Sequence, residues 1–62
     1  MPMTSKQMVR LLKKNGFVEI RTRGSHLHLY SYKSKVEVIV PMHNHDLRKG
    51  LEHQILKEAG LK

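Results

Sequence analysis

The sequence predicts an α+β domain with the element order α-β-β-β-α, in which two helices cover one face of a three-stranded antiparallel sheet. Three observations predict this class. Both ends of the chain carry apolar residues at helical spacing, the middle carries three alternating runs, and short polar or glycine-containing turns join those runs. A chain of 62 residues suits one small domain, so we expect residues 1–62 to fold as a single unit.

The first predicted element is a helix over residues 4–15. Thr4 and Gln7 have the spacing of a capping box, and Gly16 is placed to end the helix. One side is apolar and is expected to lie in the core, with Met8, Val9, Leu11 and Leu12. The opposite side is basic, with Lys6, Arg10, Lys13 and Lys14. Such a stripe is typical of a solvated helix face, and contact with a polyanion is the competing interpretation.

Three strands are predicted over residues 17–23, 26–32 and 36–40. Gly24 and Ser25 form a tight turn, so the first two strands make an antiparallel hairpin. Pro41 ends the third strand because proline cannot donate to a ladder. In the first strand, strict alternation puts Val18, Ile20 and Thr22 on one face and Glu19, Arg21 and Arg23 on the other.

The second strand is predicted to turn two histidines away from the core. If Leu27 and Leu29 point inward, alternation turns His26 and His28 outward. A helix predicted over residues 49–59, with apolar residues spaced four apart, completes the covered face. The other face is then open, and is expected to show Arg21, Arg23, His26, His28, Tyr30, Tyr32, Glu37 and Ile39.

The charge of the chain favours an anionic partner. It has 12 Lys and Arg against 5 Asp and Glu, for a formal net charge of +7. A small domain this basic favours a polyanion, or an acidic protein that imitates one, over charge that serves only solubility. No stretch has the pattern of a signal peptide or the length of a membrane span, so we expect a cytoplasmic protein with no membrane partner.

One short cluster invites a metal-site hypothesis. His43, Asn44, His45 and Asp46 stand together, but the chain has no Cys and the spacing matches no established zinc-ligand pattern. Turn and helix-capping roles for Asn44 and Asp46 are the favoured interpretation. We therefore expect neither a metal nor another cofactor.

Several blocks of the sequence together resemble the HicA toxin family of small mRNA interferases. The blocks are residues 11–17 (LLKKNGF), residues 21–26 ending in Gly24-Ser25-His26, Pro41 with His43, and residues 55–61 (ILKEAGL). The resemblance covers nearly the whole chain. The chain departs from many relatives in having Gly50-Leu51-Glu52, rather than Gly-Thr-Leu, at the start of the last helix.

The resemblance implies a fold like that of a double-stranded-RNA-binding domain, ribonuclease activity resting on His26, and an antitoxin partner of the HicB type. RNA can be cleaved without a metal because its 2′-hydroxyl is an internal nucleophile. The reaction then needs a base, an acid and cations around phosphorus. Imidazole suits both proton roles, so His26 is the candidate general acid or base. Gly24 would let the backbone approach a phosphate, and the Ser25 hydroxyl would bind it.

Further candidates for RNA contact come from the sheet and from the first helix. The candidate phosphate contacts are Arg21, Arg23, Lys6, Arg10 and Lys13. Tyr30 and Tyr32 suit base stacking, and equally suit a protein interface. His28 is either a second group on the phosphate or a spectator on the surface, and the resemblance assigns it no role.

These observations together predict a metal-independent endoribonuclease toxin that acts on mRNA and is held inactive by a HicB-type antitoxin. We expect the free toxin to be a monomer and its complex with the antitoxin to be larger. The alternative is a non-catalytic RNA-binding module of the same fold, which grips A-form RNA by shape.

Overall fold

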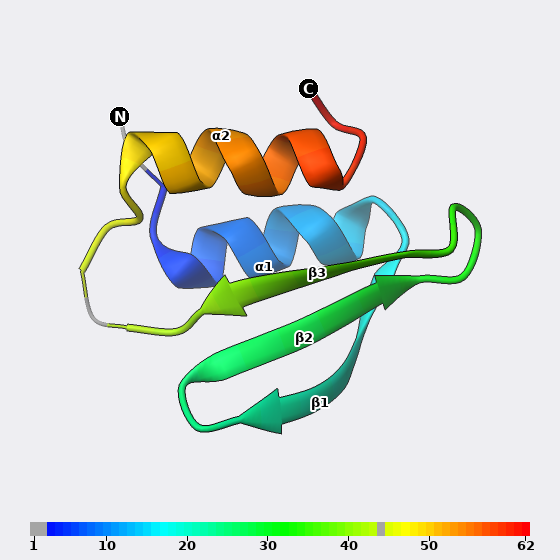
Figure 1. The fold of residues 1–62 in the computed structure, drawn as a ribbon, viewed down its shortest axis with the longest axis horizontal. Coiled ribbons are helices and arrows are strands. Elements are labelled where there is room, and N and C mark those ends of the chain that lie inside the picture. The colour runs from blue at the N-terminus through cyan, green and yellow to red at the C-terminus, as the bar shows by residue number, and fades with distance from the viewer. Residues whose placement is uncertain (1–2, 44) are drawn as a thin grey trace.

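The computed structural model describes residues 3–43 and 45–62 and has the predicted order of elements (Figure 1). They are α1 (Ser5–Lys14), β1 (Phe17–Arg23), β2 (His26–Ser31), β3 (Val36–Pro41) and α2 (Lys49–Glu58). The strands form one antiparallel sheet in the order β1-β2-β3, with β2 in the centre. The predicted fold class is confirmed.

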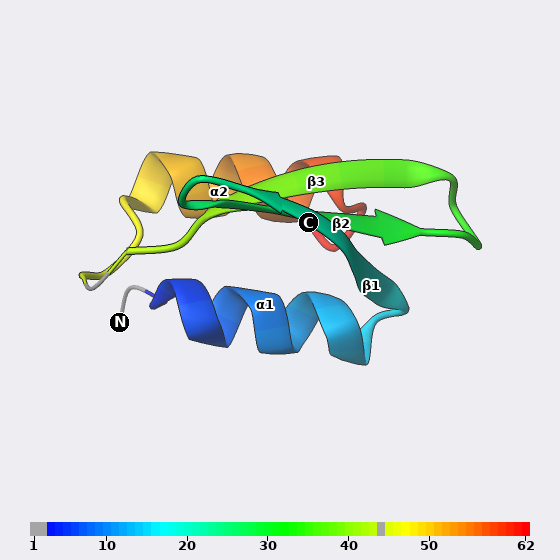
Figure 2. The ribbon, with the colours of Figure 1, turned by 90° about the horizontal axis from the view of Figure 1, so that it is seen from below.

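Both helices bury their apolar sides in one core on the inner side of the sheet. Figures 1 and 2 show α1 lying against that side and α2 running alongside β3. The buried apolar residues form a single cluster: Met8, Val9, Leu12, Phe17, Leu27, Leu29, Val38, Val40, Leu47, Ile55, Leu56 and Ala59. The outer face of the sheet is turned away from α1, and α2 borders it along β3, where Glu37 and Ile39 line a cleft with Leu51, Gln54 and Glu58.

The start of α1 is built as the sequence predicts. Thr4 Oγ1 accepts a hydrogen bond from Gln7 N at 3.1 Å, and Gln7 Oε1 accepts one from Thr4 N at 2.9 Å. At the other end, Gly16 has φ +92°, a conformation that favours glycine. Thr4 also forms an isolated antiparallel bridge with Asp46, which ties the first helix to the loop before α2.

The start of α2 differs from the prediction. Its N-cap residue is Arg48, and no side chain caps it by a hydrogen bond. Asp46 lies two residues before this N-cap, where its backbone bridges to Thr4. The other residue predicted as a cap, Asn44, lies outside the described residues.

A bulge in β1 breaks the strict alternation predicted for that strand. The register shifts between Glu19 and Arg21, so Val18 pairs with Tyr30 while Arg21 pairs with His28. Val18 and Arg21 therefore share the outer face, and the prediction that they lie on opposite faces is wrong. One extra residue between them reverses the parity of the strand.

The side chains around the bulge agree with this register. Val18 is 44% exposed and Ile20 is 38% exposed, although both are apolar. Glu19, predicted on the face of Arg21, instead pairs with Leu29 and forms an ion pair with Lys13 of α1. The bulge thus turns a carboxylate toward the helix and a valine toward solvent.

The strand register around the bulge can be tested by comparing the stability of two variants. We expect Leu29→Ala to lower the free energy of unfolding by about 2–5 kcal/mol, because it leaves a cavity beneath the central strand. Val18→Ala is the matched control and should cost less than about 1 kcal/mol, because Val18 is on the exposed face. Urea unfolding followed by circular dichroism measures both. Equal losses at the two sites would contradict the register.

Candidate functional site

The outer face of the sheet brings the two predicted histidines beside the two predicted arginines. On β1 and β2, Arg23 pairs with His26 and Arg21 pairs with His28. On the other side of β2, His26 pairs with Pro41 and His28 with Ile39 of β3. Each outward imidazole therefore has a guanidinium-bearing neighbour on one side and an uncharged one on the other.

His26 is exposed at the first position of β2, directly after the Gly24-Ser25 turn. Gly24 has φ +60°, which favours glycine and allows the tight reversal. The carbonyl of Ser25 accepts a hydrogen bond from Met42 N at 2.6 Å, so the turn is anchored to the chain beyond β3. This anchor fixes the backbone next to His26 and leaves Gly24, Ser25 and the imidazole at the surface.

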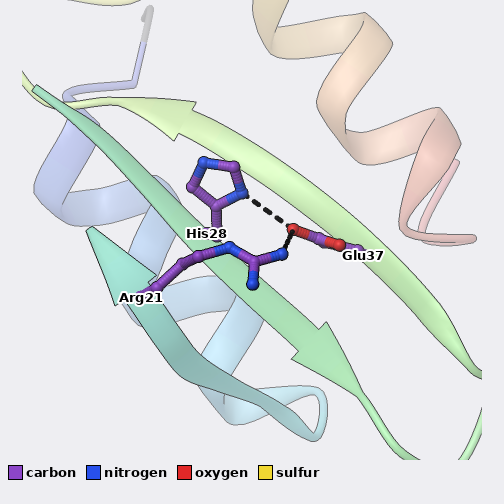
Figure 3. A network of polar contacts seen from close by, with 3 residues as sticks. All are labelled: Arg21, His28 and Glu37. Atoms are coloured by element: carbon purple, nitrogen blue, oxygen red, sulfur yellow. Dashed lines mark hydrogen bonds and ion pairs between the residues drawn. The ribbon is translucent and has the colours of Figure 1, made fainter. Parts of the chain in front are cut away.

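His28 belongs to a polar network that joins all three strands (Figure 3). Its Nδ1 lies 2.7 Å from Oε2 of Glu37 on β3. The same oxygen accepts a hydrogen bond from Nη2 of Arg21 on β1 at 3.3 Å. The His28 side chain is only 13% exposed, whereas that of Glu37 is 35% exposed. The network therefore holds a largely covered imidazole against a partly solvated carboxylate.

The network also sets the charge of Glu37. The hydrogen bond with His28 is the main cause that lowers the pKa of the Glu37 carboxyl below its usual value, and Arg21 adds to the effect. Partial desolvation opposes it. Glu37 is therefore an anion at neutral pH. Sequence analysis placed Glu37 on the open face but assigned it no role, because its diagonal contact with His28 depends on strand register.

The two tyrosines of the outer face contact each other. Tyr30 and Tyr32 pack edge to face, with ring centroids 4.8 Å apart and an interplanar angle of 81°. Tyr32 is 70% exposed, and Ile39, which pairs with His28, is 45% exposed. The outer face is therefore amphipathic, with aromatic and aliphatic surface beside the histidines and arginines.

The basic side of α1 lies on the other side of the sheet. Lys6, Arg10 and Lys13 line a cleft of about 400 Å³ with Val9, Glu19, Leu27 and Met42. Figure 2 shows α1 on the inner side of the sheet, away from the outer face. Lys13 is held in the cleft by its ion pair with Glu19. The predicted phosphate contacts thus fall into two groups on opposite sides of the sheet.

The histidines after β3 are engaged in local packing. The rings of His43 and His45 stack with centroids 4.0 Å apart, and His43 Nδ1 lies 2.9 Å from the carbonyl oxygen of His45. The buried Ser5 hydroxyl donates to the Pro41 carbonyl at 2.6 Å and accepts from His43 N at 3.4 Å. Within residues 3–43 and 45–62, no group of three or more metal-ligating side chains is gathered. None of the helices in that same part of the chain is long and apolar enough to cross a membrane.

Fold and site together define a small cationic α+β domain with imidazoles on an uncovered sheet. Comparison with protein families gives the class a name: the family described as the HicA toxin of bacterial toxin–antitoxin systems matches residues 5–61. The chain therefore belongs to the HicA toxin family. It is the toxin component of such a system, whose partner is an antitoxin. A comparison with curated proteins finds no match.

The lowered pKa of Glu37 predicts how stability depends on pH. Its carboxylate stabilises the fold fully above the ordinary carboxyl pKa of 4.5, and this contribution is lost as pH falls through the lower folded-state value. Glu37→Gln should therefore be less stable than the wild type at about pH 6, with the difference shrinking at about pH 3. Urea unfolding at both pH values measures this.

The control for this measurement is Asp46→Asn, which changes an exposed carboxylate in the loop before α2. It makes the same change of charge outside the network. A Glu37→Gln deficit that stays constant between the two pH values would contradict the role of the carboxylate charge.

Proposed function

We propose that this toxin is a metal-independent endoribonuclease, an mRNA interferase, in which His26 is a general acid or base. One observation carries the proposal: an exposed imidazole stands beside Arg23, directly after an exposed Gly24-Ser25 turn, at the corner of an uncovered sheet. Membership of the HicA toxin family supports it.

The arrangement suits transesterification of RNA. The 2′-oxygen attacks phosphorus and its proton passes to a base, while the bond from phosphorus to the 5′-oxygen breaks and that oxygen takes a proton from an acid. The products are a 2′,3′-cyclic phosphate and a free 5′-hydroxyl. In this proposal the guanidinium of Arg23, which pairs with His26, neutralises charge on the phosphate, and the Ser25 hydroxyl and the Gly24 backbone next to it along the chain bind the phosphate.

Contacts that hold RNA come from both sides of the sheet in this proposal. Arg21, Arg23 and Tyr30 act on the outer face, where Tyr30 packs against a base with its free surface. Lys6, Arg10 and Lys13 attract phosphates from the cleft beside α1. His28 adjoins the same phosphate as His26. An unpaired mRNA strand suits this surface, because stacking on tyrosine needs a splayed base.

We infer that the antitoxin is of the HicB type and inhibits by covering the outer face. The chain has a net charge of +7, which favours an acidic partner. Val18, Tyr32 and Ile39 add exposed apolar surface on the same face as the histidines. A protein that covers them also denies RNA access to His26. Because mRNA is the substrate, we place the reaction in the cytoplasm.

The test of the function is His26→Ala. We expect cleavage of an mRNA substrate to fall by about 10²–10⁴-fold, because the proton-transfer group is removed, while RNA affinity changes by less than about threefold. Wild-type cleavage should persist in excess chelator. His53→Ala, in an exposed position of α2, is the matched control and should cleave like the wild type.

Two outcomes of that experiment would change the proposal. If His26→Ala cleaves as fast as the wild type, the assignment of His26 is wrong. If the wild type binds RNA without cutting it, the protein is an RNA-binding module and not an enzyme.

The basic side of α1 has a separate test. The double variant Lys6→Ala and Arg10→Ala should weaken binding of unrelated RNA sequences to a similar degree. It should also reduce the slope of log affinity against log salt by about 1 for each phosphate that the variant no longer neutralises. The double variant Lys49→Ala and Lys57→Ala in α2 makes the same change of net charge. Equal effects in the two double variants would show that only net charge matters.

A further inference from the structure

The outer face carries a second imidazole that the proposed function leaves without a defined chemical role. His26 and His28 are two residues apart on β2, so their Cβ atoms lie about 7 Å apart on one face. That separation places one phosphodiester within reach of both rings. In-line cleavage of RNA needs an acid and a base on opposite sides of phosphorus, and a single histidine supplies one of them.

His28 is held more rigidly than His26. Its side chain is 13% exposed, and its ring is fixed at Nδ1 by Oε2 of Glu37 at 2.7 Å. The second ring nitrogen, Nε2, points away from Glu37 and lies on the side of the ring that faces the beginning of β2 (Figure 3). The carboxylate thus occupies one nitrogen and leaves the other directed toward the end of the strand that carries His26.

The surroundings of His28 differ from those of His26. The charged and titratable groups around His28 and its carboxylate partner are Glu37 from β3, Arg21 from β1, His26 and Tyr30 from β2, and Glu58 from α2, which lines the same cleft as Glu37. The Glu37 carboxylate accepts a hydrogen bond from Nδ1–H of His28, and Arg21 donates to the same oxygen. No carboxylate contacts His26 within residues 3–43 and 45–62. The asymmetry gives the two rings different proton roles.

We propose that His28 is the general acid of this ribonuclease and that Glu37 is the positioning residue that orients it. The inference rests on the proposed function and deepens it. In the step, His26 takes the proton of the 2′-hydroxyl as the bond from the 2′-oxygen to phosphorus forms. The bond from phosphorus to the 5′-oxygen breaks, and Nε2–H of His28 gives its proton to that oxygen. His26 gains one proton and His28 loses one, so the positive charge moves from His28 to His26.

The decisive substrate is an RNA with sulfur in place of the bridging 5′-oxygen at the cleavage site. A thiolate leaves without being protonated, so loss of a general acid hardly slows its departure. On ordinary RNA we expect His28→Asn to lose about 10²–10³-fold in single-turnover rate, and on the sulfur substrate less than about tenfold. The asparagine amide replaces Nδ1, so the contact with Glu37 is retained. His26→Ala should be slow on both substrates.

The measured quantity is the ratio of the two rates within each variant. A fraction of unfolded protein lowers both rates equally, so a mere loss of stability leaves the ratio unchanged. A ratio for His28→Asn that matches the wild type overturns the assignment of His28, while the dependence on His26 still upholds the proposed function. A wild type without any His26-dependent cleavage overturns both.

Glu37 is tested through the same ratio of rates. Glu37→Gln removes the carboxylate that orients the His28 ring, so its loss of rate should be larger on ordinary RNA than on the sulfur substrate, while Glu37→Asp should largely preserve the wild-type ratio. Asp46→Asn, at an exposed position of the loop before α2, should leave the ratio unchanged. A ratio for Glu37→Gln that matches the wild type would show that Glu37 serves the fold alone, and would overturn its positioning role.

Discussion

The inward packing of the β2 leucines determines what this protein can present to a partner. Leu27 and Leu29 are buried in the core, and the pleat of the strand turns the intervening residues outward. A slip of one residue in register would expose both leucines, at a cost of about 1.5–3 kcal/mol each. His26 and His28 therefore share one face because a domain of this size cannot give up two core side chains. The chemistry of the surface depends on an interaction beneath it.

Much of this arrangement could be predicted from local sequence, and the reasons are physical. A capping box, a glycine with positive φ and a strand with period two each depend on neighbours along the chain, so Thr4, Gly16 and the two outward histidines were predicted correctly. The bulge was missed because nothing in residues 17–23 distinguishes an alternating strand from one that slips. The polar network of Glu37 was missed because a diagonal contact exists only once the register of three strands is known.

The two groups of cations have different surroundings. Arg21 and Arg23 adjoin the histidines, whereas Lys6 and Arg10 lie across the sheet in the cleft beside α1. β1 is an edge strand that ends at the Gly24-Ser25 turn, so the two groups of cations lie on opposite sides of the sheet near this edge. The turn therefore stands where two sides of the molecule meet. A partner that covers only the outer face still leaves the cleft beside α1 open.

A single hydroxyl links the helix to the corner where His26 lies. Ser5, at the first position of α1, donates to the carbonyl of Pro41, and Pro41 is the residue of β3 that pairs with His26. The same hydroxyl oxygen receives the amide of His43. If the first turn of α1 frays, the end of β3 thus loses this hydrogen bond. The local stability of the strand ends around His26 therefore depends on α1, although no side chain of α1 lies beside His26. Replacing this serine by alanine would leave a partly buried carbonyl without its donor, and would loosen this end of the sheet while every residue on the outer face stays the same.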